Sequence, residues 1–201
     1  MKAMMKDAAI LFLITLIAGC LLGVVYDVTK DPIAAQQAKA KNEACKNVFE
    51  AADSFEAYAD FDSDTAASLM EEEGYDASID EVMTAVDGAG NILGYVVTVT
   101  DHEGYGGDIQ YSMGITLDGN VNGISLLSIS ETAGLGMRAD EVLVPQFVDK
   151  AVDQFVYTKS GASADNEIDA ISGATITTNA VVNGANAALC YYKEVLMEGG
   201  N

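Results

Sequence analysis

The first long feature of the chain is an apolar run at residues 8–26, which contains no charged side chain and lies between Asp7 and Asp27. As a helix it would be about 28 Å long, close to the thickness of the hydrocarbon core of a bilayer. The alanine-rich residues 33–49 carry interspersed charges without glycine or proline, a pattern typical of a helix. We therefore expect a tail at 1–7, a transmembrane helix at 8–26 and a helical linker at 27–50.

Three other interpretations of the apolar run fit its sequence less well. A buried helix of a soluble domain would leave one end of a small chain hydrophobic all round. Lys2 and Lys6 suggest a cleaved signal peptide, but no A-x-A site follows and the run stays apolar to Val25. Residues 17–20 resemble a lipoprotein-processing site, yet apolar or glycine residues continue beyond Cys20. We interpret the run as a retained single-pass anchor, whose orientation the flanking lysines do not settle.

Beyond residue 81 the pattern changes to that of strands joined by tight turns. Valine, isoleucine, threonine and tyrosine dominate most of the runs, and short turns favour antiparallel pairing. Two hairpins are predicted, each from two runs around a glycine-containing turn: 82–86 and 92–100 around 87–91, and 109–117 and 121–128 around 118–120. The sequence therefore predicts four consecutive antiparallel strands.

The rest of the chain predicts helices and one loop. Residues 140–156 look helical around Pro145, residues 157–166 form a polar loop, and residues 179–197 form a closing helix. The core positions of that closing helix, by their spacing, are Val182, Ala185, Leu189, Tyr192 and Leu196. The predicted fold class is α+β: an antiparallel sheet with packed helices in a domain at 51–201, preceded by one N-terminal transmembrane helix.

The charge of the chain is strongly negative, with 10 Lys and Arg against 31 Asp and Glu and a formal net charge of −21. Nucleic-acid binding needs a basic surface, so we expect no nucleic-acid partner. Residues 53–81 are acidic without a basic residue, which we interpret as a solvated face rather than a cation-attracting surface. No lysine or arginine occurs between Lys46 and Arg138. A phosphate bound there would depend on backbone N–H groups.

Histidine and cysteine are too few to indicate a metal or catalytic cluster. The single histidine, His102, gives no basis for a His-based triad or a metal site. Cys20, Cys45 and Cys190 are odd in number and show no CxxC spacing. Within one chain Cys45 and Cys190 could still form a disulfide.

Two short segments carry the candidate chemistry. Residues 169–178 lead into the closing helix and offer N–H groups and hydroxyls at the positive end of its dipole, which suits a phosphate. Helix capping would explain some of these hydroxyls as well. Residues 131–136 (Glu-Thr-Ala-Gly-Leu-Gly) follow the fourth strand. Their two glycines would let the backbone approach a flat ligand, and an ordinary turn explains the same pattern equally well.

These segments resemble the two signatures of covalent FMN-binding domains. Ser-Gly-Ala-Thr at 172–175, with Asp169 three positions before the serine, is similar to the flavinylation motif. Residues 131–136 are similar to the second signature, with Ala133 where the family usually has proline, and Gly-Tyr-Gly-Gly at 104–107 also fits. From end to end the chain resembles the G subunits of Rnf-type ion-translocating ferredoxin:NAD oxidoreductases, relatives of the C subunits of sodium-pumping NADH:quinone oxidoreductases.

The resemblance implies an FMN site in which the cofactor is bound through a phosphoester to the Thr175 hydroxyl. A separate flavin transferase would make the bond from FAD and recognise a motif that includes Asp169 and Ser172. Gly173 and Ala174 would keep the approach to Thr175 open. Phosphate binding or helix capping is implied for Thr177 and Thr178, and contact with the isoalloxazine ring for Glu131, Thr132, Gly134, Leu135, Gly136 and Tyr105.

By the same resemblance the chain would be the electron-relay subunit of a membrane-bound ion pump. It would have no independent catalytic site and no metal, and its partners would be the other membrane subunits of the complex. The domain would lie on the extracytoplasmic side of the cell membrane. The alternatives are a stand-alone membrane-anchored flavoprotein for extracellular electron transfer and a scaffold that has lost its flavin. The intact motif around Thr175 argues against the scaffold.

Overall fold

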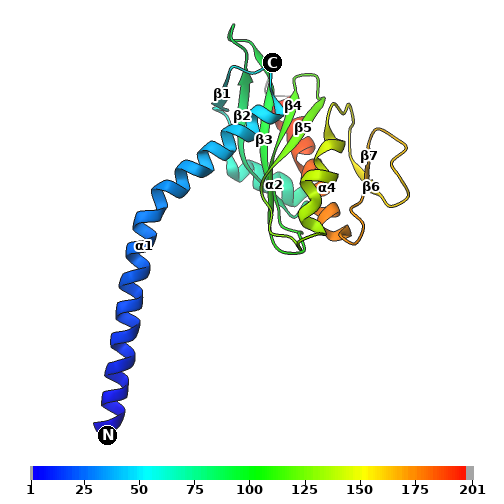
Figure 1. The fold of residues 1–201 in the computed structure, drawn as a ribbon. Helices are drawn as coiled ribbons and strands as arrows, with labels where there is room; N and C mark the ends of the chain where they lie inside the picture. The colour runs from blue at the N-terminus through cyan, green and yellow to red at the C-terminus, as the bar shows by residue number, and fades with distance from the viewer. Residues whose placement is uncertain (1, 198–201) are drawn as a thin grey trace. The chain divides into compact units, whose positions relative to one another are not determined.

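The structure is a computed structural model that describes residues 2–197 (Figure 1). Helix α1 (Lys2–Val48) opens the chain. The protein divides into two compact units, one ending at Ala40 and the other beginning at Lys41. The last turns of α1 are therefore part of the second unit, which also contains every strand.

The first unit is the part of α1 that precedes Lys41. Its apolar side chains are exposed, as Leu11 and Leu21 show with 66% and 63% of their surface accessible. The helix is long and apolar enough to cross a membrane. It runs without a break through residues 2–7 and through Pro32. Pro32 lacks one backbone N–H donor, but the neighbouring hydrogen bonds of the helix continue.

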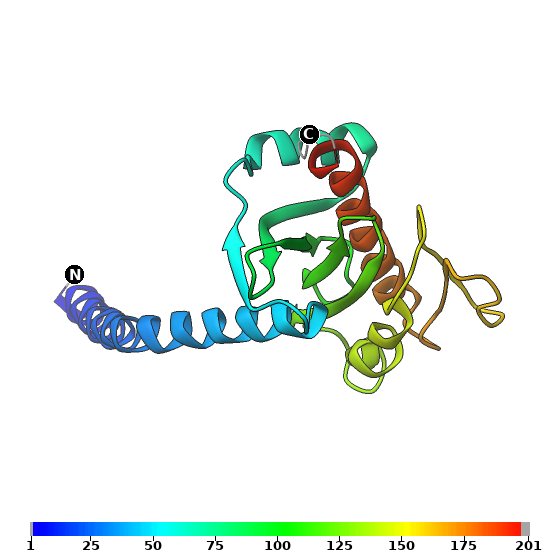
Figure 2. The ribbon, with the colours of Figure 1, turned by 90° about the horizontal axis from the view of Figure 1, so that it is seen from above.

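The second unit contains a five-stranded antiparallel sheet in which each strand pairs with the next along the chain (Figure 2). Its strands are β1 (Ser54–Ala57), β2 (Ala77–Val86), β3 (Ile92–Asp101), β4 (Ile109–Thr116) and β5 (Val121–Ser128). Both predicted hairpins, β2–β3 and β4–β5, are confirmed. The sequence pattern misses β1 and the first half of β2, because acidic side chains interrupt the alternation of apolar residues there.

Helix α2 (Ser63–Glu73) lies between β1 and β2 and is also missed by the pattern. Asp62 caps its start by accepting a hydrogen bond from the Thr65 N–H at 2.9 Å. Gly74 ends it with a φ of 76°, a left-handed conformation that glycine adopts without a Cβ clash. Ala66 and Met70 are buried, whereas the acidic side chains of α2 are exposed. The acidic residues of this helix thus form part of the solvated face predicted from the sequence.

The segment after β5 is less helical than predicted. The helix predicted at 140–156 is wrong, because the chain forms only three short pieces: η1 (Gly136–Arg138), α3 (Ala139–Val142) and η2 (Val144–Phe147). Asp149 then adopts a φ of 53°, which a right-handed helix does not accommodate. Strands β6 (Val156–Thr158) and β7 (Glu167–Asp169) form a separate parallel pair at either end of the polar loop.

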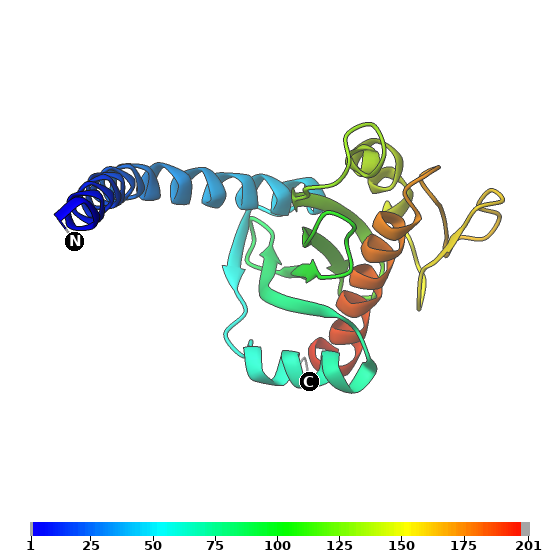
Figure 3. The same cartoon turned by 90° about the horizontal axis from the view of Figure 1, so that it is seen from below.

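Helix α4 (Thr175–Tyr191) closes the domain and continues into the π-helical turn η3 (Tyr192–Leu196). It packs on the sheet together with α2 (Figures 2 and 3). Its start at Thr175 is earlier than predicted, since the threonines there are part of the first helical turn. The Tyr111 hydroxyl ties β4 to this helix by donating to the Val181 carbonyl at 2.7 Å. All five predicted core residues of the helix are buried: Val182, Ala185, Leu189, Tyr192 and Leu196.

The opposite face of the sheet is covered by the last turns of α1. A second apolar cluster joins Cys45, Val48 and Phe49 to residues of β2 and β3. Cys190 lies in α4, on the other face of the sheet. Both cysteines are free, so the disulfide that the cysteine count leaves open does not form in this structure.

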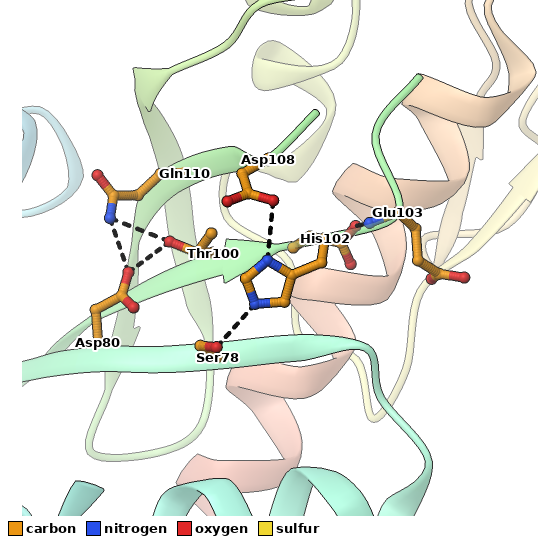
Figure 4. A network of polar contacts seen from close by, with 8 residues as sticks. Ser78, Asp80, Thr100, His102, Glu103, Asp108 and Gln110 are labelled. Carbon is orange, nitrogen blue, oxygen red and sulfur yellow. Dashed lines mark hydrogen bonds and ion pairs between the residues drawn. The ribbon is translucent and has the colours of Figure 1, made fainter. Parts of the chain in front are cut away.

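Polar contacts connect the strands farther along the same outer face (Figure 4). Asp80 of β2 accepts a hydrogen bond from Thr100 of β3 at 2.6 Å. His102 contacts Ser78 at 2.8 Å and Asp108 at 3.0 Å, so the fold places a serine, a histidine and a carboxylate in series. Asp108 is 65% exposed, which keeps the strength of this ion pair low. We interpret these contacts as structural: they hold β2 against the end of β3 and the start of β4.

Gly114 of β4 lies directly under the end of α1, where an added Cβ would be 2.8 Å from the Val48 carbonyl oxygen. We predict that Gly114→Ala lowers the melting temperature of the full-length protein in detergent, with a cost of about 1–3 kcal/mol from overpacking. The matched control is Gly88→Ala, where an added Cβ meets no atom within 4 Å. Equal melting temperatures for Gly114→Ala and the unaltered protein would show that α1 does not pack against β4.

Candidate functional site

One pocket of the domain is built from three segments that are far apart in sequence. Its volume of about 490 Å³ is in the usual range for small-molecule sites. The loop after β3, the segment after β5 and the start of α4 supply its lining: Tyr105, Glu131, Thr132, Leu135, Gly136, Gly173, Ala174, Thr175, Ile176 and Thr177. All of these except Ile176 are among the site residues predicted from the sequence.

Glu131 connects the three segments by hydrogen bonds. Its side chain is largely buried, with 9% of the residue exposed. Oε1 accepts a bond from the Gly106 N–H at 3.0 Å, and Oε2 accepts one from the Thr177 hydroxyl at 2.8 Å. Burying a carboxylate is costly unless its oxygens are hydrogen-bonded. These two bonds therefore hold the loop after β3 and the start of α4 at fixed positions on either side of Glu131.

Two glycines allow these segments to approach each other closely. A Cβ on Gly106 would lie 2.0 Å from the Ser130 carbonyl oxygen, and a Cβ on Gly136 would lie 2.6 Å from Thr177 Oγ1. Gly136 thus permits the backbone to approach α4. Gly134 is outside the pocket lining and has a φ of 77° with open space around its Cβ position. Within residues 131–136, Gly136 therefore allows close packing against α4, whereas Gly134 allows a left-handed turn.

Thr175, the first residue of α4, lies half-buried in the pocket wall. Ala174 precedes it as the N-cap and provides no side-chain cap. The first hydrogen bond within the helix runs from the Thr178 N–H to the Ala174 carbonyl at 3.0 Å. The N–H groups of the first turn have no partner inside the helix and lie at its positive end. The pocket lining offers these donors to an anion, and it includes no lysine or arginine.

Thr177 and Thr178 use their hydroxyls inside the protein. Thr177 donates to Glu131, while Thr178 Oγ1 accepts from the Ile171 N–H at 3.1 Å and donates to the Ala174 carbonyl at 3.0 Å. Their exposed fractions are 1% and 0%. Of the three threonines in this turn, Thr175 is the one with a partly exposed side chain.

Asp169 and Ser172 lie outside the pocket lining, on the chain that leads to Thr175. Asp169 ends β7, and its Oδ1 accepts a hydrogen bond from the Ala162 N–H at 2.7 Å. The Asp169 N–H donates to Gln146 Oε1 at 2.7 Å, so the backbone is held there as well. Ser172 is exposed. Gly173 follows with a φ of 80°, and the turn it makes brings the chain into the pocket wall.

Apolar side chains form the open edge of the pocket. Tyr105 is 69% exposed, Leu135 40% and Ile176 53%. Apolar side chains grouped at the surface mark a place where a ligand or a partner binds. Ile176 is the lining residue that the sequence interpretation missed. The sequence carries one signal that Ile176 belongs to the pocket. It lies off the apolar stripe of the closing helix and so faces solvent, where a large apolar side chain is unusual.

Comparison with known proteins gives matches along most of the chain. Residues 104–190 match the FMN-binding domain family, and residues 1–48 match the RnfG N-terminal region. The G subunit of the Na(+)-translocating ferredoxin:NAD(+) oxidoreductase complex of Acetobacterium woodii is 32% identical, covering 96% of this chain and 94% of its own. The G subunit of the ion-translocating oxidoreductase complex of Methanosarcina acetivorans is 32% identical, with 94% and 95% covered.

Two further matches complete the comparison. The G subunit of the proton-translocating ferredoxin:NAD(+) oxidoreductase complex of Clostridium ljungdahlii is 29% identical, with 92% of each chain covered. The crystal structure of NqrC from Shewanella oneidensis aligns with a TM-score of 0.47 and 20% identity, covering 56% of this chain and 57% of that one.

The α+β domain therefore contains an FMN-binding domain, by its match to that family, and it is joined to a helix long and apolar enough to cross a membrane. The chain belongs to the family of G subunits of ion-translocating oxidoreductase complexes. The family resemblance drawn from its sequence is thereby confirmed.

The hydrogen bond between Thr177 and Glu131 can be tested by Thr177→Val, which keeps the shape of the side chain and removes the donor. One oxygen of the buried carboxylate then loses its partner, which typically costs about 1–3 kcal/mol. We predict a lower melting temperature for this variant in detergent. Thr132→Val, an exposed threonine of the same pocket, is the control and should change it little. If both variants melted alike, the Thr177–Glu131 bond would not be what holds the pocket together.

Proposed function

We propose that the protein is the electron-relay subunit of a membrane-bound ion-translocating oxidoreductase complex and carries FMN through a phosphoester to Thr175. The proposal rests on the position of Thr175. Its side chain is partly exposed in the wall of the pocket, at the positive end of α4, whereas Thr177 and Thr178 are buried and already hydrogen-bonded. Of the three threonine hydroxyls at the start of α4, that of Thr175 is thus the one available for attachment.

The residues of the pocket suit both ends of FMN. A phosphodiester keeps one negative charge, which the start of α4 would stabilise by about 0.3–1 kcal/mol. Tyr105, Leu135 and Ile176 would give the isoalloxazine ring apolar and aromatic contacts. Glu131 would keep its bonds to Gly106 and Thr177 and so preserve the shape of the pocket. FMN itself would supply the one- and two-electron redox chemistry, while the protein supplies its position and its electrostatic surroundings.

Attachment would be made by a separate flavin transferase that takes the FMN moiety from FAD. The Thr175 oxygen would bond to the phosphorus on the flavin side, the pyrophosphate bond would break, and AMP would leave. The hydroxyl proton would go to solvent. Ser172 and Gly173 are exposed, so the motif lies where a second protein can reach it. The hydrogen bonds of Asp169 hold the backbone that presents it.

The relatives support a role within a complex over a stand-alone flavoprotein. Their names assign them to sodium- or proton-translocating complexes, and they match this chain over nearly their whole length. We infer that α1 anchors the protein by a single pass, that the domain lies on the extracytoplasmic side, and that other membrane subunits exchange electrons with the flavin. Covalent attachment suits that location, because a dissociated flavin would be lost from the cell.

Attachment to Thr175 is tested by co-expressing the protein with a flavin transferase. We expect the intact mass to rise by one FMN less water and the denatured band to fluoresce in a gel. Thr175→Ala should lose both signals completely, because the acceptor oxygen is gone. Thr132→Ala, in the same pocket, is the matched control and should keep both. An adduct that persisted in Thr175→Ala would move the attachment to another residue and refute the assignment.

Anchoring and orientation are tested in intact cells and membranes. We expect the full-length chain to stay in the membrane fraction after a carbonate wash, since residues 8–26 of α1 form an uncharged apolar stretch whose side chains are exposed. A protease added to spheroplasts should digest the domain, while a tag at the N-terminus remains protected. A soluble chain, a lipid-bearing chain beginning at Cys20, or a domain protected from external protease would each contradict this topology.

A further inference from the structure

Asp101 is a fully buried carboxyl group that neither the pocket nor the core explains. It is the last residue of β3 and has 0% exposure. Its Oδ1 accepts a hydrogen bond from the Glu103 N–H at 2.9 Å. Its Oδ2 is buried and has no hydrogen-bond partner among the described residues. A lone buried carboxylate oxygen is costly, and addition of a proton removes the charge that causes the cost.

The surroundings of Asp101 favour the neutral acid. Helix α4 packs against it, since a Cβ on Gly184 would lie 3.2 Å from the Asp101 Cβ, and α4 carries no charged residue. From β4 the neighbour is Tyr111, whose hydroxyl is already donated to Val181. Burial raises the pKa of the Asp101 carboxyl to about 7, and the charges of Glu103 and Asp76 act in the same direction.

Two groups act against this rise. The Glu103 N–H and the adjacent His102 both stabilise the carboxylate and lower the pKa of Asp101. His102 faces the outer side of the sheet, where it pairs with Asp108 (Figure 4). The balance leaves the pKa of the Asp101 carboxyl at about 7, so the group changes its protonation state around neutral pH. Small changes of charge nearby can therefore move a proton on or off it.

Asp101 is connected to the flavin pocket by two routes. Along the chain, Glu103 leads directly into the loop that carries Tyr105 and Gly106, which contact the pocket and Glu131. Through the core, α4 runs from Thr175 in the pocket wall to Gly184 beside Asp101, about 13 Å of helix. A negative charge added in the pocket therefore acts on Asp101 through the low-permittivity interior of the domain and raises its pKa.

We propose that Asp101 is a proton-binding site coupled to the redox state of the pocket: the protonated fraction of its carboxyl group rises, with protons drawn from solvent, when the flavin becomes more negative, and falls again on reoxidation. The electron comes from the redox partner that reduces the flavin, and the only bond made or broken at Asp101 is its O–H bond. This inference rests on the proposed function, because it needs a flavin in the pocket.

The test compares the flavin-loaded full-length protein with its Asp101→Asn variant in detergent. The mass of the adduct is measured first, so that failure to load, which would refute the proposed function, is seen separately. Midpoint potentials are then measured from pH 5.5 to 8.5, together with proton uptake during reduction, read with a pH indicator. We expect a break in the pH dependence near neutral pH and a fraction of a proton per electron beyond what the flavin itself takes up. Asp101→Asn should lose this break and this additional uptake, and keep only the pH dependence that belongs to the flavin.

Two variants accompany this comparison. Asp118→Asn removes an exposed carboxylate at the β4–β5 turn and should keep both the break and the proton uptake. Glu103→Gln removes a negative neighbour while its side-chain oxygen can still accept from Asn183, so the break should move to lower pH. This second variant keeps the test decisive even if Asp101→Asn does not fold. Identical pH dependence in a loaded Asp101→Asn or Glu103→Gln protein would overturn the proposal.

A flavin-free measurement isolates the carboxyl group itself. The raised pKa means that Asp101 stabilises the fold fully below its unfolded pKa near 4, and that this contribution is lost as the pH rises through about 7. In the Thr175→Ala background, unfolding should therefore become easier between pH 4 and 7 with Asp101 and show less of this trend with Asn. The same trend in both proteins would show that Asp101 does not titrate in this range, which would overturn the proposal.

Discussion

The pocket exists because one buried carboxylate, Glu131, has to satisfy both of its oxygens. It accepts one bond from the loop after β3 and one from the first turn of α4, and each bond fixes a segment that would otherwise be a free surface loop or a helix end. Gly136 lets the backbone pass close enough for the second bond to form. The approach of the segments, the pocket between them and the exposure of Thr175 all follow from this arrangement.

Helix geometry explains why neighbouring threonines differ so much. Successive residues of a helix are separated by about 100° around its axis, so Thr175 and Thr177 lie on nearly opposite sides. Thr177 falls on the side that packs against Glu131, and its hydroxyl is used there. Thr178 lies only about 60° around the axis from Thr175, but its hydroxyl is occupied by the bonds to Ile171 and Ala174. Thr175 is left partly open, next to N–H groups that have no partner within the helix.

Local signals predicted the hairpins and the core stripe of α4, because alternation, Asp-Gly turns and helical spacing are properties of short segments. The residues that line the pocket were expected from the resemblance to family motifs, and not from these signals. The pattern did not predict β1 and α2, because the many acidic residues of that stretch face solvent and carry no signal of backbone conformation. Pro145 was compatible with a helix by pattern, but the positive φ of Asp149 comes from the packing of the whole segment. The contacts of Glu131, the burial of Asp101 and the partners of His102 depend on residues distant in the chain, which spacing alone does not reveal.

The negative charge of the chain bears both on the attachment of a cofactor at Thr175 and on the buried carboxyl group of Asp101. With no lysine or arginine in the pocket lining, an anionic cofactor would gain little from electrostatic attraction, and a bond to Thr175 would make retention independent of affinity. Each electron delivered to such a site adds negative charge to an already acidic domain. Exposed carboxylates are screened by salt and water, whereas a buried carboxyl group packed against α4, such as Asp101, is screened much less. A proton held at Asp101 is therefore well placed to offset the charge that reduction brings into the interior.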